Sequence, residues 1–186
     1  MCPDHQGIPK FPCIQAFFLL PLSPVTHSSP NLTPAQGGLR VEPATIEDLP
    51  ALTTLVLELM ELQPDFTPVR ENHEKGLRLV LEEPSRGRIL VLRNDDRIIG
   101  MVNLLFTIST ALGGFAILME DVIVHPDHRG QGYGSVLVEN AIDFAKQKGF
   151  KRLTLLADKL SSQSQAFFRN HDFEFSHLIP MRRIID

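Results

Sequence analysis

The segment at residues 119–135 combines an apolar strand, a glycine-rich loop and the start of a helix: Met-Glu-Asp-Val-Ile-Val-His-Pro-Asp-His-Arg-Gly-Gln-Gly-Tyr-Gly-Ser. Gly130, Gly132 and Gly134 let the backbone approach a ligand closely, because glycine has no side chain and adopts conformations that other residues avoid. A helix that begins near Gly134 points its unpaired N–H groups and the positive end of its dipole at the same place. The segment therefore predicts a site for phosphate or pyrophosphate.

Other phosphate-binding loops fit this segment less well. No Gly-Lys-Ser/Thr sequence follows, and the glycine spacing is G-x-G-x-G rather than the G-x-G-x-x-G of dinucleotide sites. The loop contains no lysine, so Arg129 and backbone N–H groups would have to hold the anion. A plain turn between strand and helix is the alternative, but the flanking strand and the long amphipathic segment after the loop favour a binding site.

Composition agrees with a single enzyme-sized domain. A chain of 186 residues has room for one sizeable core. The net charge is −4 and the basic residues are scattered, which argues against nucleic acid as a partner. Both cysteines, Cys2 and Cys13, lie near the N-terminus, so no disulfide or zinc framework is expected in the folded part. A reducing cytoplasm suits this composition.

Residues 1–38 differ from the rest of the chain. Prolines recur throughout them, with Ser, Thr and Asn between, up to Gly37 and Gly38. This composition predicts a disordered N-terminal extension. The alternative is that translation starts at a later codon than assumed, so that the native protein lacks this segment. The apolar run at residues 14–20 is too short to span a bilayer, although a cleaved signal peptide has a similar outline. The folded domain is expected at residues 39–186.

The pattern from Leu39 onward alternates between strands and helices, which predicts a mixed sheet with helices around it. Helical spacing and turn signals place helices near residues 46–60, 71–83, 134–148 and 162–171. Pro64 is expected to end the first helix. Strands are expected at 39–43, 88–93, 97–107, 115–125, 151–157 and 173–184.

The motif Val124-x-Pro126-x-x-Arg129-Gly130-x-Gly132-x-Gly134, preceded by Glu120 and Asp121, resembles the acyl-CoA motif of the GNAT superfamily of N-acyltransferases. The order of elements from Leu39 onward is also similar. The resemblance implies a twisted mixed sheet flanked by helices, with acetyl-CoA as the co-substrate and no metal. It also implies that the CoA pyrophosphate and pantetheine contact two runs of residues: Val122, Ile123 and Val124 on the strand, and Arg129, Gly130, Gln131, Gly132, Tyr133, Gly134 and Ser135 in the loop.

Acetyl transfer to an amine needs a group that accepts a proton, because a free alkylamine has a pKa of about 10.4. Glu120 and Asp121 are the candidate catalytic residues. In an extended strand they would face opposite sides, so only one of them could point at the acceptor. The resemblance favours Glu120, which stands where some members carry the base. Backbone N–H groups of residues 122–124 would stabilise the negative charge that develops on the carbonyl oxygen.

The far side of the cofactor departs from the family pattern in three places. Phe168 stands where many members have a tyrosine that protonates the leaving thiolate, Ser161 where an asparagine often contacts the cofactor, and Asp172 where a glycine is usual. Ser161 and Phe168 are still expected at the cofactor. Because a thiol pKa of about 8.5 makes thiolate a tolerable leaving group, turnover need not be lost. The alternative is a non-catalytic module that binds acyl-CoA as a sensor or interaction platform.

The remaining candidate residues concern a metal site and the acceptor pocket. His125 and His128 are three residues apart across a proline turn and lack an evident third ligand, so no metal site is expected. By resemblance, residues 60–72 and 107–114 would line the acceptor pocket, where Glu61 and Asp65 could attract a cationic amine. We expect a small-molecule or peptide amine as the acceptor, no membrane partner, and leave a homodimer open.

Overall fold

The computed structural model describes residues 38–61 and 67–185. The predicted N-terminal extension lies outside these residues except for Gly38, and so do both cysteines, Pro64 and Asp65.

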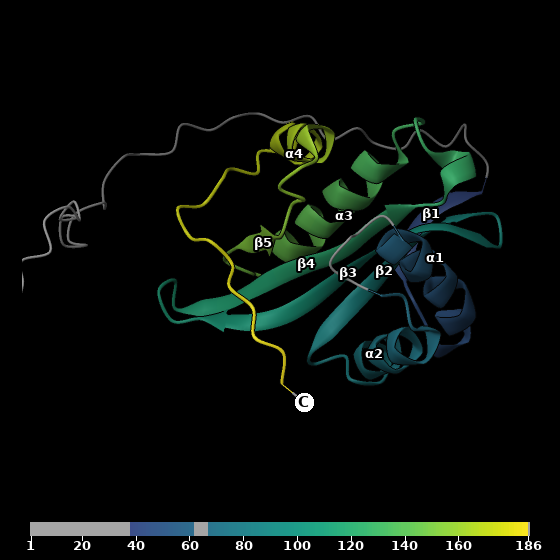
Figure 1. Ribbon diagram of the computed structural model, residues 1–186, viewed down its shortest axis with the longest axis horizontal. Helices are drawn as coiled ribbons and strands as arrows, with labels where there is room; N and C mark the ends of the chain where they lie inside the picture. The colour runs from purple at the N-terminus through teal and green to yellow at the C-terminus, as the bar shows by residue number, and fades with distance from the viewer. Residues whose placement is uncertain (1–37, 62–66, 186) are drawn as a thin grey trace, which may run out of the picture. The chain divides into compact units, whose positions relative to one another are not determined.

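The described chain forms a five-stranded mixed sheet in the order β1-β2-β3-β4-β5 (Figure 1). The strands are β1 (Leu39–Pro43), β2 (Gly87–Asn94), β3 (Arg97–Ser109), β4 (Gly114–Val124) and β5 (Leu153–Leu155). The first four pair antiparallel, and β5 pairs parallel to β4. The helices are α1 (Leu49–Glu61), α2 (Arg70–Glu82), α3 (Tyr133–Gln147) and α4 (Ser162–Arg169), with short 3-10 turns at Ile46–Asp48 (η1) and Pro126–His128 (η2). This arrangement confirms the predicted fold class.

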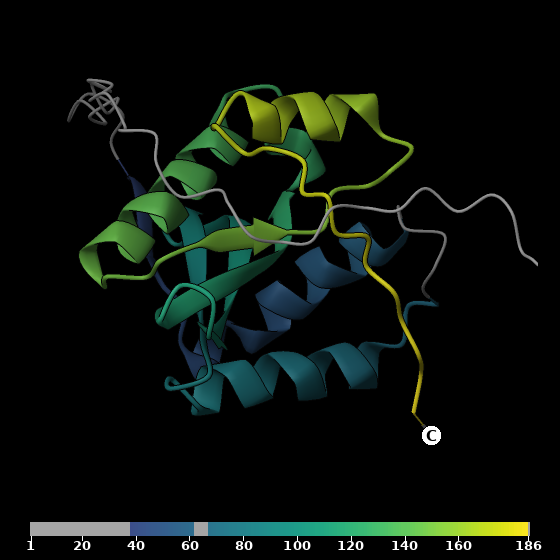
Figure 2. The same cartoon turned by 90° about the vertical axis from the view of Figure 1, so that its left-hand side faces the viewer.

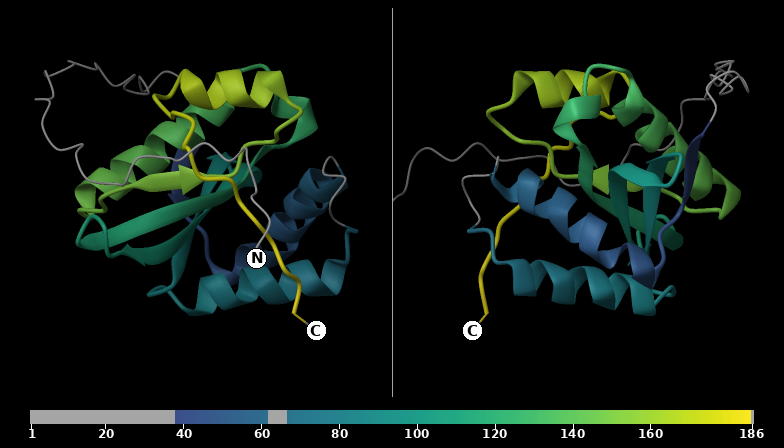
Figure 3. Two further views of the ribbon diagram at one scale, coloured as in Figure 1. Left: turned by 60° about the vertical axis from the view of Figure 1, so that its left-hand side comes forward. Right: turned by 90° about the vertical axis from the view of Figure 1, so that its right-hand side faces the viewer.

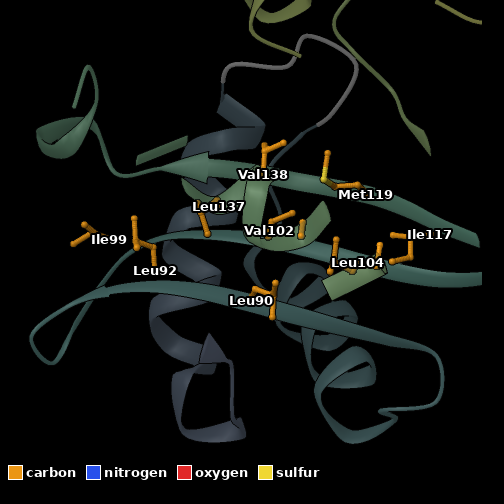
Figure 4. Packing of buried hydrophobic residues seen from close by; sticks show 11 residues of the cluster. Leu90, Leu92, Ile99, Val102, Leu104, Ile117, Met119, Leu137 and Val138 are labelled. Atoms are coloured by element: carbon orange, nitrogen blue, oxygen red, sulfur yellow. The ribbon is translucent and has the colours of Figure 1, made fainter. Parts of the chain in front are cut away.

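Helices cover both faces of the sheet, which explains the continuous apolar run of β2. Leu90 and Leu92 pack with β3, β4 and α3 (Figure 4), whereas Ile89 and Val91 face α1 and α2. Figure 2 shows α1 and α2 together on one side of the sheet and α3 on the other. We call these the α1/α2 face and the α3 face.

The start of α1 is joined to the sheet by a half-buried ion pair. The backbone N–H of Thr45 donates to Asp48 Oδ2 at 2.9 Å, closing a capping box. Asp48 Oδ1 accepts from Arg93 Nη2 at 2.7 Å, and Arg93 also pairs with Glu42. Burial raises the pKa of the Asp48 carboxyl, but hydrogen bonds from Arg93 and Thr45 outweigh burial and hold this pKa below its ordinary value.

Two expectations for the C-terminal part differ from the structure. β5 is shorter than the predicted 151–157, and the predicted strand at 173–184 is wrong, because these residues form no strand. β5 offers only three residues for pairing, and Pro180 has no N–H to donate to a ladder. Large apolar side chains of this segment are exposed, namely Phe175, Leu178, Ile179, Met181, Ile184 and Ile185.

Candidate active site

The loop after β4 has the conformation of an anion-binding turn. Gly130 and Gly132 adopt left-handed backbone angles, with φ of 75° and 81°. A Cβ built on either glycine would meet no atom within 4 Å, so backbone conformation and not crowding requires glycine here. Gly132 is also the N-cap of α3. The loop therefore turns the chain sharply and directs the start of α3 toward the end of β4.

The first turn of α3 offers backbone donors at this place. The N–H of Val136 donates to the carbonyl of Gly132 at 3.2 Å, so the N–H groups of Tyr133, Gly134 and Ser135 precede the helical hydrogen-bond pattern. Arg129 is anchored beside them, because its Nε donates to the carbonyl of Val124 at 2.8 Å. These donors and the dipole of α3 fit a phosphate or pyrophosphate group.

A cavity of about 390 Å³ lies against this loop. The predicted cofactor residues that line it are Val122, Ile123, Val124, Arg129, Gly130, Gly132, Tyr133, Gly134 and Ser135. Gln131 is exposed and does not line it. His128 and Phe167 also line the cavity, although neither is among the cofactor residues predicted above. Neighbouring residues of a helix point in different directions, so the expected position of Phe168 gave no signal for Phe167. Phe167 faces Gly134, whose added Cβ would lie 3.3 Å from the ring.

A β-bulge changes the direction of the candidate carboxylates. Met101 pairs with Ile123 but Asn103 pairs with Glu120, so one residue of β3 lies opposite two residues of β4, Asp121 and Val122. Asp121 has a positive φ of 49°. Directly paired residues share a face of the sheet, and the same Asn103 that pairs with Glu120 donates its Nδ2 to Asp121 Oδ2 at 3.1 Å. The expectation that the two carboxylates face opposite sides is therefore wrong.

Both carboxylates lie on the α1/α2 face, where they are partly shielded from solvent. Burial raises the pKa of the Glu120 carboxyl, the Asp121 charge raises it further, and Arg182 acts in the opposite direction. Burial also raises the pKa of Asp121, against the Asn103 amide and the His73 imidazole, which lower it. A carboxylate with a raised pKa accepts a proton more readily near neutral pH than a solvated one does.

The far side of the cavity is formed by α4, which lies beside the start of α3 (Figure 3). His171 Nε2 is 3.0 Å from the hydroxyl of Ser135, which connects the two helices. Ser161 is the N-cap of α4, because its Oγ accepts from the N–H of Ser164 at 3.1 Å. Phe168 lines a separate pocket between β5 and the C-terminal segment. The cofactor roles of Ser161, Phe168 and Gln131 stay predictions.

His125 and His128, the two histidines of the proline turn, face different neighbours. His125 Nε2 lies 3.8 Å from Glu58 Oε1 on α1, whereas His128 faces the cavity. Within residues 38–61 and 67–185, no three His, Cys, Asp or Glu side chains come together in a way that could hold a metal ion. No helix in the same residues has the length and apolar character needed to cross a membrane.

Comparison with known proteins identifies the group to which this arrangement belongs. The family described as "Acetyltransferase (GNAT) family" matches residues 56–173, which contain β4, the glycine-rich loop, α3 and α4. The chain belongs to the GNAT acetyltransferase family. The GNAT motif thus coincides with the residues that line the cavity.

Individual relatives of this GNAT chain are also acetyltransferases. It is 26% identical over 134 residues to the aminoalkylphosphonate N-acetyltransferase of Salmonella typhimurium, covering 72% of this chain and 84% of that enzyme. Several other curated acetyltransferases are matched over a third of their length or less.

Solved structures share the fold of this GNAT chain. An aminoglycoside acetyltransferase from an uncultured soil metagenomic sample, in complex with sisomicin, has a TM-score of 0.65 at 20% identity, with 80% of this chain and 97% of that one covered. An acetyltransferase from Clostridium acetobutylicum with acetyl-CoA has a TM-score of 0.63 at 14% identity, covering 77% and 96%. At these identities the likeness shows the GNAT fold.

Proposed function

We propose that this chain transfers an acetyl group from acetyl-CoA to a primary amine of a small molecule or peptide by direct attack. The observation that carries the proposal is the bulge of β4. It places Glu120 and Asp121 on the α1/α2 face, while Val122 and Val124 pack on the α3 face and line the cavity beside the glycine-rich loop. Because β5 pairs with β4 only at residues 117–119, donor and acceptor would meet at the edge of β4 beyond this pairing.

The residues present fit CoA. The left-handed Gly130 and Gly132 leave open space where a side chain would stand, and the first N–H groups of α3 would bind the pyrophosphate. Acetyl-CoA, when bound, supplies an activated acetyl group. A bulge leaves a backbone N–H outside the regular ladder, and an N–H near Val122 would donate to the carbonyl oxygen as it gains negative charge.

Glu120 would take the proton from the acceptor amine, directly or through one water. Its partial burial and the adjacent Asp121 charge support this assignment, because both raise the pKa of its carboxyl. The acid that would protonate the thiolate has no assigned residue. Thiolate can leave without one, since a thiol pKa is about 8.5.

The acceptor is proposed as a small amine or a peptide amine. The Salmonella relative is named for aminoalkylphosphonates and one structural neighbour is complexed with sisomicin, which supports small cationic amines as the first candidates. The net charge of −4 supports an acceptor other than nucleic acid. We propose the cytoplasm as the compartment, with which the absence of cysteine from residues 39–186 is compatible, and we leave a homodimer as a proposal. Since its relatives are named as enzymes, a non-catalytic sensor is not favoured.

Thiol release from acetyl-CoA tests the proposal. The panel comprises 2-aminoethylphosphonate, sisomicin, free amino acids and a peptide with a free N-terminus, each with the wild-type chain and with Glu120→Gln. We expect at least one amine to give release well above the Glu120→Gln rate. Binding of CoA without such release for any amine would overturn the proposal for that panel.

A further inference from the structure

A polar cluster lies on the α1/α2 face next to Glu120, the proposed base. The role of Glu120 as a base does not explain why the other polar side chains are there. The cluster consists of Asp121 in the bulge of β4 and Asn103 on β3, which are hydrogen-bonded, and of His73 on α2, which is near enough for its charge to act on Asp121. Asn103 is only 6% exposed, yet it lies in the centre of the sheet among apolar neighbours. Polar side chains at such positions normally have all their hydrogen bonds satisfied.

The cluster is incompletely satisfied by the protein. Asn103 Nδ2 donates to Asp121 Oδ2, but Asn103 Oδ1 and His73 Nε2 are fully covered and have no hydrogen-bond partner within the described chain. The carboxylate fixes the orientation of the amide, because only the NH₂ group can donate to it. A cluster that served packing alone would be replaced by apolar side chains at lower cost.

The second oxygen of Asp121 is not used by the described part of the protein. Oδ1 has no donor among the described residues, and it is not one of the fully covered atoms. The Asn103 amide therefore holds the carboxylate by one oxygen and leaves the other to the acceptor side of the site. The bulge and the positive φ of Asp121 bring this oxygen to the face that carries Glu120.

We propose that Asp121 binds the acceptor as an ammonium ion beside Glu120, and that Asn103 is a positioning residue that holds Asp121 in this orientation. The inference rests on the proposed function and adds a division of labour to it. An ammonium group has several N–H donors, so it can bind Asp121 Oδ1 while it gives one proton to Glu120. The site would thus select acceptors that are cationic before reaction over neutral alcohols of the same shape.

Equilibrium binding separates this role from catalysis. The probes are 2-aminoethylphosphonate and its alcohol analogue 2-hydroxyethylphosphonate, with n-butylamine and sisomicin as further amines, titrated calorimetrically into the CoA complex. The variants are Asp121→Asn and, as a matched control, Asp143→Asn, which makes the same change on the exposed side of α3. We expect Asp121→Asn to weaken the amine by about 10- to 100-fold, with affinity for the alcohol and for CoA within about twofold.

A double-mutant cycle tests Asn103. Asn103→Leu should weaken amine binding in the wild-type background but add almost nothing to Asp121→Asn, because both changes remove the same interaction. Additive losses would mean that Asn103 acts only on packing and would overturn its positioning role. The assignment of Asp121 is overturned if no amine binds the wild-type complex more tightly than the Asp121→Asn complex.

The binding role of Asp121 and the proposed transferase function can be contradicted separately. Amines that bind through Asp121 but give no thiol release would contradict the transferase and leave the binding assignment intact. Normal turnover with an unchanged KM for the amine in Asp121→Asn would contradict the binding assignment and leave the transferase intact.

Discussion

Replacing Gly132 with valine should abolish CoA binding without unfolding the chain. Gly132 has a φ of 81° and an added Cβ there would meet no atom within 4 Å, so we expect valine to fit while its side chain occupies the anion site. The left-handed conformation costs about 1–2 kcal/mol for a residue with a Cβ, which corresponds to a fall in Tm of roughly 2–8 °C for a chain of this size. The same helix provides a control in Gly149, which has a φ of 74° and equally open space, but at the opposite end of α3.

The expected loss of affinity follows from the donors that the valine displaces. Two backbone N–H contacts to a phosphate, at about 1.5–3 kcal/mol each, together contribute about 3–6 kcal/mol. This loss corresponds to a roughly 10²- to 10⁴-fold weaker Kd for CoA. Calorimetric titration should show this loss in Gly132→Val and near wild-type affinity in Gly149→Val, although both variants lose similar stability. Equal affinity in the two variants would show that the pyrophosphate binds elsewhere.

Three further predictions concern the base, the ion pair of Asp48 and the leaving thiolate. Glu120→Gln should lower kcat by about 10²- to 10⁴-fold with CoA affinity unchanged. Because the pKa of Glu120 is raised, kcat/KM of the wild-type chain should begin to fall, as the pH is lowered, at a pH above the ordinary glutamate pKa of 4.5. Asp121→Asn should shift this fall to lower pH, because it removes a charge that raises the pKa of Glu120. Asp48→Ala should cost about 2–4 kcal/mol in urea unfolding, because it removes a charge-assisted hydrogen bond to Arg93, which keeps Glu42 as a partner, together with the capping box at Thr45. Asp96→Ala, at a fully exposed site, should cost almost nothing. Phe168→Tyr should raise turnover if thiolate departure limits it, and an unchanged steady-state rate with a good acceptor would discard that idea.

The glycine-rich loop was predictable because its signals are local. Gly130 and Gly132 lie between a β-branched strand and an amphipathic helix, and their positive φ angles follow from residue type and neighbours. The end of α1 near Glu61 and the start of α2 were predictable for the same reason.

The acceptor side could not be read in the same way, because it depends on pairing between distant segments. The bulge opposite Asn103 is set by the register of β3 against β4, which strand alternation alone does not specify. His73 joins the cluster only through the packing of α2. The segment after α4 has apolar residues suited to a strand, but it forms no pairing within the described chain.

The most direct measurement of the central claim follows the acetyl group itself. The protein is mixed with acetyl-CoA, with and without the best amine of the panel, and mass spectrometry is applied to both the protein and the small molecule. Direct transfer predicts that the amine becomes an amide at its nitrogen only when the protein is present, while the protein stays unacetylated in both mixtures. Acetylated protein in the absence of amine, or thiol release without amide formation, would contradict direct transfer to the amine.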